Sequence, residues 1–170
     1  WSPVLPITFA SYGSCSGARA SIDSVTITNS SYLTLSELSI NDTLGGTTVS
    51  VSDSSYVSLL DSDLSGNTSV CFNALNSTWT TIWWSTMGNC QYGLSLLNTD
   101  ASVSNNIFSG ITENAVTVLG NNAVSISNNT FSNIGESAIL YGELTNVSQN
   151  NITNACTTAS TNCAGIRNNP

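Results

Sequence analysis

Large apolar residues recur along this chain at nearly regular intervals, each inside a short run in which Ser or Thr alternates with apolar side chains. Residues 101–111, 124–134 and 145–155 are the clearest copies, and three looser copies precede them. One large apolar residue anchors each copy, and the six anchors are Ile40, Leu64, Trp84, Phe108, Phe131 and Ile152. Their period of about 22 residues indicates a repeat architecture.

Alternating runs in each copy predict two clear β-strands, with a short third strand around the anchor. The first run includes an apolar residue five positions before every anchor: Leu35, Leu59, Trp79, Val103, Ile126 and Val147. We therefore expect Trp79 to be a core residue. The second run follows most anchors by eight to ten positions and occupies residues 49–51, 94–96, 116–118 and 139–141, after an opening copy at 25–27.

Three short strands cannot bury an apolar face alone, but successive copies can stack each strand on its equivalent about 4.8 Å away. Inward positions then form apolar columns, and outward positions form hydrated rows of Ser and Thr: Thr34/Ser36, Thr78/Thr80, Ser102/Ser104 and Ser125/Ser127. Asn106, Asn129 and Asn150 each lie two positions before an anchor. We expect their stacked amides to hydrogen-bond along the axis as a structural ladder.

The motif Ser-Asn-Asn-x-Phe-Ser-x-Ile that carries these copies resembles the right-handed parallel β-helix repeats of the pectate-lyase-like superfamily. The resemblance is clean for residues 94–155, looser for 22–93 and absent from 1–20. It implies an all-β chain with a single-stranded right-handed parallel β-helix of about six coils at residues 21–170. Residues 1–20, which the resemblance does not cover, are expected to form an extended N-terminal arm. Such coils occur in polysaccharide lyases and hydrolases, phage tailspikes, adhesins and surface glycoproteins, so function depends on the side chains.

Charge narrows the function, because the 170 residues include 2 Lys+Arg, 10 Asp+Glu and no His, for a net charge of −8. So few cations cannot neutralise a row of phosphates, and no apolar stretch approaches the roughly 18 residues of a membrane span, so we expect neither nucleic acid nor membrane as a partner.

Superfamily members that cleave uronates use an Arg or Lys base. Here Arg19 and Arg167 lie outside the recognisable coils and Lys is absent. The sequence therefore favours a non-catalytic protein without a cofactor or metal.

Two pairs of carboxylates are candidates for chemistry, because the period places their members on adjacent coils: Glu37 with Asp61, and Glu113 with Glu136. Carboxylates about 5 Å apart share a proton, bind Ca²⁺ or suit a retaining glycosidase. The alternative is that they are solvated loop acids that keep the surface soluble. We favour this alternative, because calcium requires more oxygen ligands than two carboxylates supply.

Trp83 is a candidate for contact with a sugar or a partner. If Trp84 points inward, alternation directs Trp83 outward, where an indole stacks on a sugar ring or on another subunit. A local bulge that buries both rings is an equal alternative.

Seven N-x-Ser/Thr sequons indicate an exported glycoprotein. Asn128 adjoins the predicted Asn ladder and is left out, so that we expect covalent glycans at Asn29, Asn41, Asn67, Asn76, Asn146 and Asn151.

The five cysteines lack a His or Cys-x-x-Cys partner, which favours disulfides in an oxidising compartment. The separation of Cys71 from Cys90 is close to one coil, and Cys156 and Cys163 bracket a short loop. These spacings predict two bridges and leave Cys15 over, although other pairings stay open. A secreted or cell-surface location follows.

The ends of the solenoid provide the strongest functional hint. Residues 1–14 are apolar and extended by prolines, and residues 164–170 are short and polar, so neither end supplies a recognisable cap. Identical subunits with uncovered strand edges stack into filaments, which makes an extracellular structural or adhesive fibre our preferred hypothesis. The alternatives are a polysaccharide-active enzyme, a glycan-binding module, or one segment of a longer adhesin.

Overall fold

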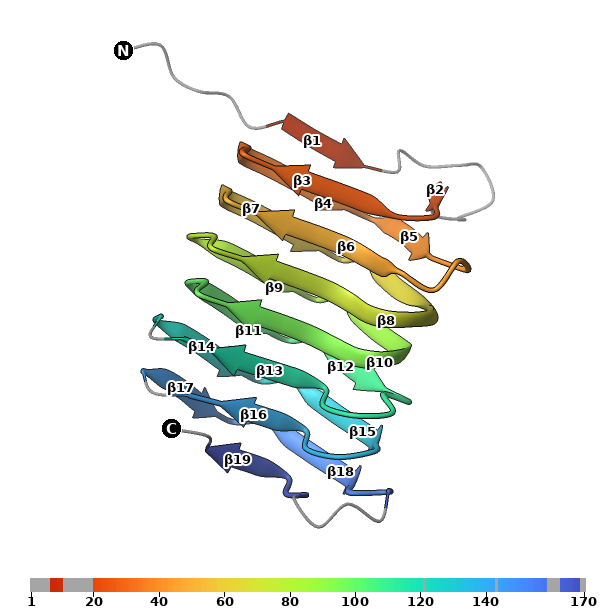
Figure 1. Cartoon of the computed structure of the whole chain (residues 1–170), viewed down its shortest axis with the longest axis vertical. Coiled ribbons are helices and arrows are strands. Elements are labelled where there is room, and N and C mark those ends of the chain that lie inside the picture. The colour runs from red at the N-terminus through yellow and green to blue at the C-terminus, as the bar shows by residue number, and fades with distance from the viewer. Residues whose placement is uncertain (1–6, 11–19, 121, 143, 159–162, 169–170) are drawn as a thin grey trace.

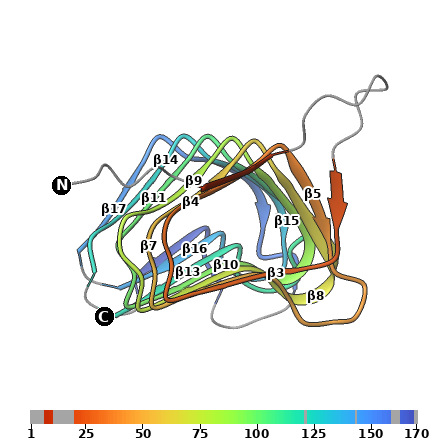
Figure 2. The same cartoon turned by 90° about the horizontal axis from the view of Figure 1, so that it is seen from above.

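The chain forms an all-β solenoid in the computed structural model, with its first and last strands at opposite ends of the stack (Figure 1). The structure describes residues 7–10, 20–120, 122–142, 144–158 and 163–168. Within these residues there are nineteen strands and no helix, and therefore no helix that could span a membrane. Seen from above, successive turns superimpose around a common axis (Figure 2). The predicted fold class is confirmed.

One face of the solenoid is a parallel sheet of seven strands, so that the chain makes six turns from the first of them to the last. Ile7 and Phe9 pair in register with Leu33 and Leu35, so part of the range expected to form an arm belongs to the solenoid, whereas residues 1–6 and 11–19 lie outside the described residues. In order along the axis, the strands are β1 (Ile7–Ala10), β4 (Ser31–Ser36), β7 (Ser55–Leu60), β9 (Thr80–Trp83), β11 (Ala101–Ser104), β14 (Val124–Ser127) and β17 (Thr145–Ser148).

The remaining twelve strands form a sheet that bends into two further faces. The long strands β8 (Asp63–Leu75) and β10 (Thr86–Leu97) contribute to both faces, because each pairs with two short strands of the neighbouring turn. The second face also holds β2 (Ala20–Ile22), β5 (Leu38–Asn41), β12 (Ile107–Ser109), β15 (Thr130–Ile134) and β18 (Asn151–Ala155). The third face also holds β3 (Val25–Thr28), β6 (Thr47–Ser52), β13 (Val116–Leu119), β16 (Ile139–Tyr141) and β19 (Ile166–Asn168).

Inward side chains of equivalent strands form apolar columns along the axis. The column that contains the anchors runs in register through Ile22, Ile40, Leu64, Met87, Phe108, Phe131 and Ile152. The six predicted anchors therefore all lie in this column except Trp84. Trp84 is 60% exposed, and the fully buried Met87 occupies its place in the column. With Met87 as the anchor, the spacing of the anchors along the sequence is also more even.

The error has a clear origin, because two pairs of residues fit the same pattern. Trp79 and Trp84 are five positions apart, and so are Ile82 and Met87. In the structure Ile82 joins the interior column of the first face, and the two tryptophans lie at corners between faces, with positive φ angles of 55° and 51°. The prediction that Trp79 is a core residue is wrong, since it is 63% exposed.

Ile82 and Met87 lie three positions after Trp79 and Trp84, and this shift of three positions also changes which residues of β9 face outward. On β9 the residues in register with Ser102 and Ser104 are Thr81 and Trp83 rather than Thr78 and Thr80. Thr80, predicted to face solvent, is buried, and its hydroxyl oxygen has no hydrogen-bond partner.

The predicted asparagine ladder is confirmed and extends further than expected. Asn106 Nδ2 donates to Asn129 Oδ1, and Asn129 Nδ2 donates to Asn150 Oδ1, both at 3.0 Å. Toward the N-terminus, serines continue the column: the Ser85 N–H donates to Asn106 Oδ1 at 2.9 Å, and the Ser62 N–H donates to Ser85 Oγ at 3.2 Å. One polar position in each turn thus satisfies buried backbone groups of its neighbour.

Both predicted disulfides are present. Cys71–Cys90 joins β8 to β10 in adjacent turns, and both residues are buried in the core. Cys156–Cys163 closes the loop after β18. Cys15 lies outside the described residues.

Candidate functional site

The N-terminal end of the solenoid opens into a hollow between the first two turns. Among the described residues, β1, β2 and β3 each pair with one neighbour only. A cavity of about 530 Å³ lies inside them, and its apolar lining comprises Phe9, Ile22, Val25, Ile27, Leu33 and Leu35. Phe9 is 55% exposed at the rim. Within the residues that the structure describes, the interior columns are thus accessible from this end.

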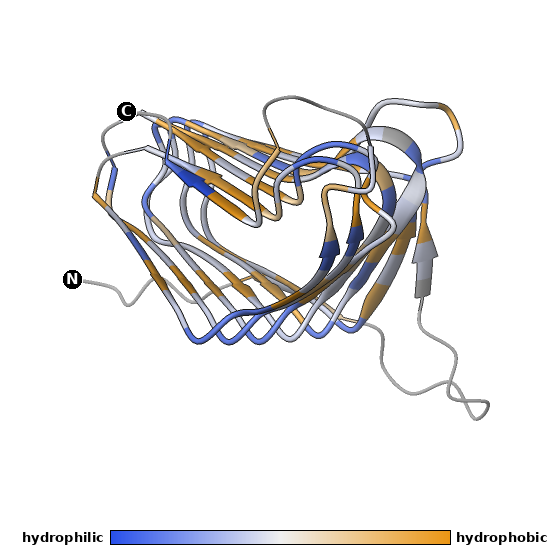
Figure 3. Ribbon diagram, turned by 90° about the horizontal axis from the view of Figure 1, so that it is seen from below, coloured by the Kyte–Doolittle hydropathy of each residue, from blue (hydrophilic) through white to orange (hydrophobic). Residues whose placement is uncertain are grey.

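The opposite end exposes the same columns. In the part of the chain that the structure describes, β17, β18 and β19 each have one paired neighbour, and their edges face away from the stack. Val147, Ile152 and Ala155 pack against the core but are only partly buried, and Ile166 is exposed. Figure 3 looks onto this end and shows hydrophobic and hydrophilic residues alternating along the strands of the ring.

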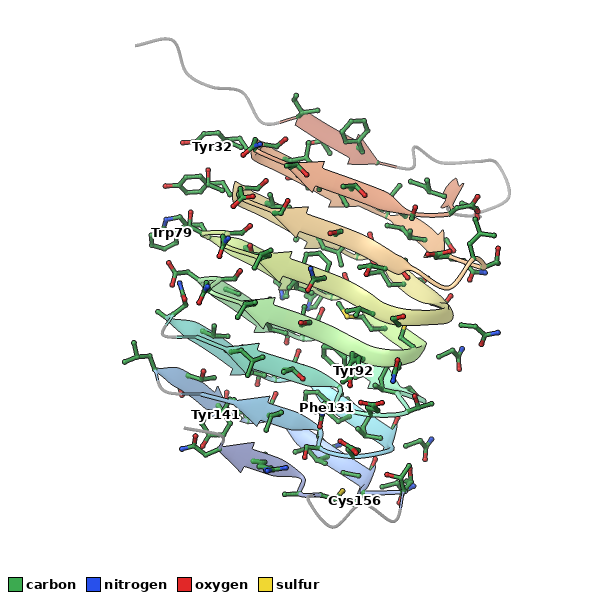
Figure 4. All side chains as sticks on the ribbon, viewed as in Figure 1. Tyr32, Trp79, Tyr92, Phe131, Tyr141 and Cys156 are labelled. Carbon is green, nitrogen blue, oxygen red and sulfur yellow. A yellow bond between two sulfur atoms is a disulfide. The ribbon has the colours of Figure 1, made fainter. Side chains whose placement is uncertain are left out.

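An aromatic stack occupies the corner that precedes the seven-stranded face. Tyr32 and Tyr56 have ring centroids 4.7 Å apart and planes 4° apart, and Tyr56 and Trp79 have values of 6.1 Å and 7°. All three have positive φ angles, near 55°, which turn the chain at the corner. Figure 4 shows Tyr32 and Trp79 projecting from this same corner.

A second hollow, of about 400 Å³, adjoins the aromatic stack. Trp79 and Tyr56 form its apolar part, and Asp100 is its charged group. Its other lining residues are Ser58, Thr80, Thr81, Ala101, Ser102 and Ala123. This site was not predicted from the sequence, although the stacked aromatic residues recur at the repeat period, a signal that could have found them.

Trp83 faces outward from β9, as predicted, and is 41% exposed. Its ring lies 4.7 Å from that of Trp84 at an angle of 35°, so the two indoles form a separate apolar patch on another corner. The alternative in which both rings are buried is wrong.

The carboxylate pairs lie on adjacent turns, as expected. The Glu37 and Asp61 N–H groups donate to the carbonyls of Leu60 and Trp83, one turn away in each case, which places the two acids at equivalent corners. The Glu136 N–H donates to the Glu113 carbonyl at 3.0 Å.

The Glu113 carboxylate is engaged by neighbouring side chains. It accepts a hydrogen bond from Gln91 Nε2 and another from the Tyr92 hydroxyl. This second bond, together with burial and the negative charges of Glu113 and Glu136, raises the pKa of Tyr92 to about 12. Among the described residues there is no group of three or more His, Cys, Asp and Glu arranged to hold a metal ion.

A family comparison accounts for the whole repeat region, since the model of the right-handed β-helix region matches residues 13–169. The chain belongs to this right-handed β-helix family. Comparisons with curated proteins and with solved structures found no match. The family accounts for the handedness and the architecture of this β-helix, whereas its function must be argued from its ends and its outer surface.

The sequons of the β-helix all present an exposed asparagine. Asn128 is among the exposed asparagines. It was left out of the expected glycosylation sites because the neighbouring asparagine ladder was expected to enclose it, and that expectation is wrong. Asn76 lies in a corner row with Asp53 and Asn98: its Nδ2 donates to Asp53 Oδ1 at 3.4 Å, and its Oδ1 accepts from Asn98 Nδ2 at 3.3 Å. Occupancy by glycans stays a prediction at every position.

Proposed function

We propose that this β-helix is a non-catalytic structural glycoprotein of the cell exterior whose copies stack end to end into a filament. The observation that carries the proposal is the continuity of the interior columns from the N-terminal hollow to the last turn. The anchor column begins at Ile22 and ends at Ile152, and both residues are only partly buried. The apolar surface at each end is the surface that the next turn would cover.

A second copy is the occupant that fits these ends. If its first turn follows the last turn of the copy before it, its Ile22 lies over Ile152 at the spacing of adjacent strands, about 4.8 Å. The edges of β17, β18 and β19 then meet those of β1, β2 and β3, so that each of these strands gains a second neighbouring strand. Unpaired parallel edges favour pairing with another chain.

The two ends present different strands, which favours a head-to-tail contact. The first turn presents the edges of β1, β2 and β3 beside the N-terminal hollow, and the last turn presents the edges of β17, β18 and β19. A heterologous contact of this kind repeats without closing and produces an open filament.

The outer surface suits a structural glycoprotein. The net charge of −8 derives from few ionisable groups, and most outward rows carry Ser, Thr and Asn. Glycans at the exposed sequons would hydrate this weakly charged surface and limit lateral association. Two disulfides support an oxidising, secreted or surface location.

Electron microscopy and sedimentation of the purified chain test the proposal. We expect filaments whose axial repeat corresponds to seven stacked strands, about 34 Å at the spacing of a parallel sheet. Phe9→Asp places a charge in the N-terminal hollow and should abolish filaments. Leu44→Asp adds the same charge at an exposed loop between β5 and β6 in the second turn, on the side of the solenoid, and should leave filaments intact.

A folded wild-type chain that stays monomeric at high concentration would overturn the proposal. So would loss of filaments in Leu44→Asp with normal assembly of Phe9→Asp, because assembly would then use the side of the solenoid. Circular dichroism of each variant verifies that the solenoid is folded.

A further inference from the structure

Among the described residues the aromatic stack stops at Trp79, and this leaves one face of its indole without a neighbouring ring. Trp79 and Asp100 directly precede Thr80 and Ala101, which are partners in register on β9 and β11. Ala123 precedes Val124, the partner of Ala101 in the next turn. In the next two turns the positions equivalent to those of the aromatic stack thus hold the shorter side chains Asp100 and Ala123. The hollow of about 400 Å³ occupies the space that further rings would fill.

The polar groups of this hollow are held in place by backbone and amide contacts. Asp100 Oδ1 accepts hydrogen bonds from the Ala123 N–H at 2.9 Å and from Asn122 Nδ2 at 3.3 Å. These bonds orient the carboxylate beside the indole. Ser58, Thr81 and Ser102 line the same hollow and belong to one outward row of the seven-stranded face, since they pair in register.

A flat apolar ring beside a fixed carboxylate and a row of hydroxyls matches the chemistry of a sugar. A pyranose presents C–H bonds on one face, which pack on an aromatic ring, and hydroxyls around its rim, which donate to a carboxylate and exchange hydrogen bonds with Ser and Thr. The volume lies within the range of about 300 to 1,000 Å³ that small-ligand sites occupy.

We propose that the hollow between Trp79 and Asp100 binds a neutral pyranose sugar. The Asp100 carboxylate and the net charge of −8 oppose uronates and phosphorylated ligands. A quaternary ammonium is the other ligand that selects an aromatic ring and a carboxylate, but it prefers several rings that surround it. The three rings here are parallel within 7° for each stacked pair and do not form such a cage.

The site lies on the side of the solenoid and does not depend on the end-to-end contact. A single chain therefore binds the sugar whether or not it forms filaments. In a filament the same site would recur once in every subunit, and its weak individual affinity would be multiplied on a surface that carries many sugars.

Saturation-transfer NMR with methyl glycosides tests the proposal. The protein is prepared without N-glycans, and the probes are methyl α-mannoside, methyl β-glucoside, methyl β-galactoside and methyl β-N-acetylglucosaminide. We expect transfer to the C–H protons of one ring face of at least one probe. Trp79→Ala and Asp100→Asn should each weaken that binding about tenfold, which corresponds to the loss of one stacking or charge-assisted contact.

Trp84→Ala is the matched control, because Trp84 is also an exposed tryptophan at a corner with positive φ, on the other patch. It should bind the sugar as the wild type does. Binding that is lost in Trp84→Ala and retained in Trp79→Ala would overturn the proposal, as would absence of binding to all four probes or preferential binding of choline or methyl glucuronide. If Trp79→Ala fails to fold, Asp100→Asn alone decides the outcome.

Discussion

Asn129 Oδ1 accepts two hydrogen bonds from Asn106, one from its backbone N–H at 2.9 Å and one from its side-chain Nδ2 at 3.0 Å. Asn129 also acts as a donor to that same turn, because its Nδ2 donates to the Val103 carbonyl at 3.0 Å. Both asparagines are almost completely buried. A single amide thus satisfies the interior polar groups of the adjacent turn, where an unpaired group costs about 1–3 kcal/mol.

Asn129→Ala should reduce the free energy of unfolding by about 1–3 kcal/mol, because it leaves the buried Asn106 N–H without its acceptor and removes the side-chain hydrogen bond to the Val103 carbonyl. Urea denaturation followed by circular dichroism measures the change. Asn146→Ala is the control, since it removes an exposed amide from β17 and should change stability by less than about 0.5 kcal/mol. Equal losses in the two variants would show that the ladder contributes nothing specific.

Substitutions of Met87 and Trp84 test which of these two residues is the anchor that occupies the interior column. Met87→Ala should cost about 2–5 kcal/mol, because it removes a fully buried side chain from the anchor column. Trp84→Asn should change stability by less than about 1 kcal/mol, because the side chain is exposed and asparagine tolerates a positive φ. Thermal or urea unfolding measures both. A larger loss for Trp84→Asn would support the register in which that indole points inward.

Tyr92 provides a prediction about pH. Its pKa in the folded protein, about 12, exceeds the ordinary value of 10.0, so folding favours the neutral phenol. The resulting stabilisation is complete below pH 10 and is lost as the pH rises through about 12. The difference in phenolate absorbance between the wild type and Tyr92→Phe should therefore titrate near pH 12. Glu113→Gln should move this titration down toward pH 10, and an unchanged titration would mean that Glu113 is not the cause.

The two disulfides should differ in their contribution to stability. Their sequence separations are 19 and 7, and the longer loop restricts the unfolded chain more. Replacing Cys71 and Cys90 by alanine should cost about 3 kcal/mol, and replacing Cys156 and Cys163 about 2 kcal/mol, in the chain-entropy model. Urea denaturation of the two double variants under non-reducing conditions measures the difference. A greater cost for the terminal pair would contradict this order.

Much of the fold was predictable because a repeat encodes its own stacking. Once Phe108 and Phe131 are seen one repeat period apart in the same local pattern, their alignment on adjacent turns follows, and the structure places their rings 4.9 Å apart. The same reasoning located Asn106 and Asn129 in one ladder. The Cys71–Cys90 bridge followed as well, because a separation close to one period brings two cysteines into adjacent turns.

The prediction failed where two residues had equal claims to one position. Ile82 and Met87 satisfy the spacing of five positions as well as Trp79 and Trp84 do, and the choice of the largest apolar side chain as the anchor favoured the tryptophans. The size of a side chain does not report the backbone conformation of a corner. At a positive φ between two faces the side chain is directed away from the core, whatever its apolar character.

The sequence by itself determined the period, the asparagine ladder and, outside the copy that contains Trp79 and Trp84, the alternation of inward and outward residues, because each depends only on spacing along a regularly coiled chain. It also favoured the two cysteine pairs that the structure joins. The tertiary structure alone decided which residues occupy the corners, and therefore that Tyr32, Tyr56 and Trp79 form an exposed stack beside Asp100. It also decided which apolar residues of the first and last turns are exposed, Phe9 and Ile166 among the described ones. Exposure of a side chain depends on what the neighbouring turns place next to it, and that relationship exists only after the turns have stacked.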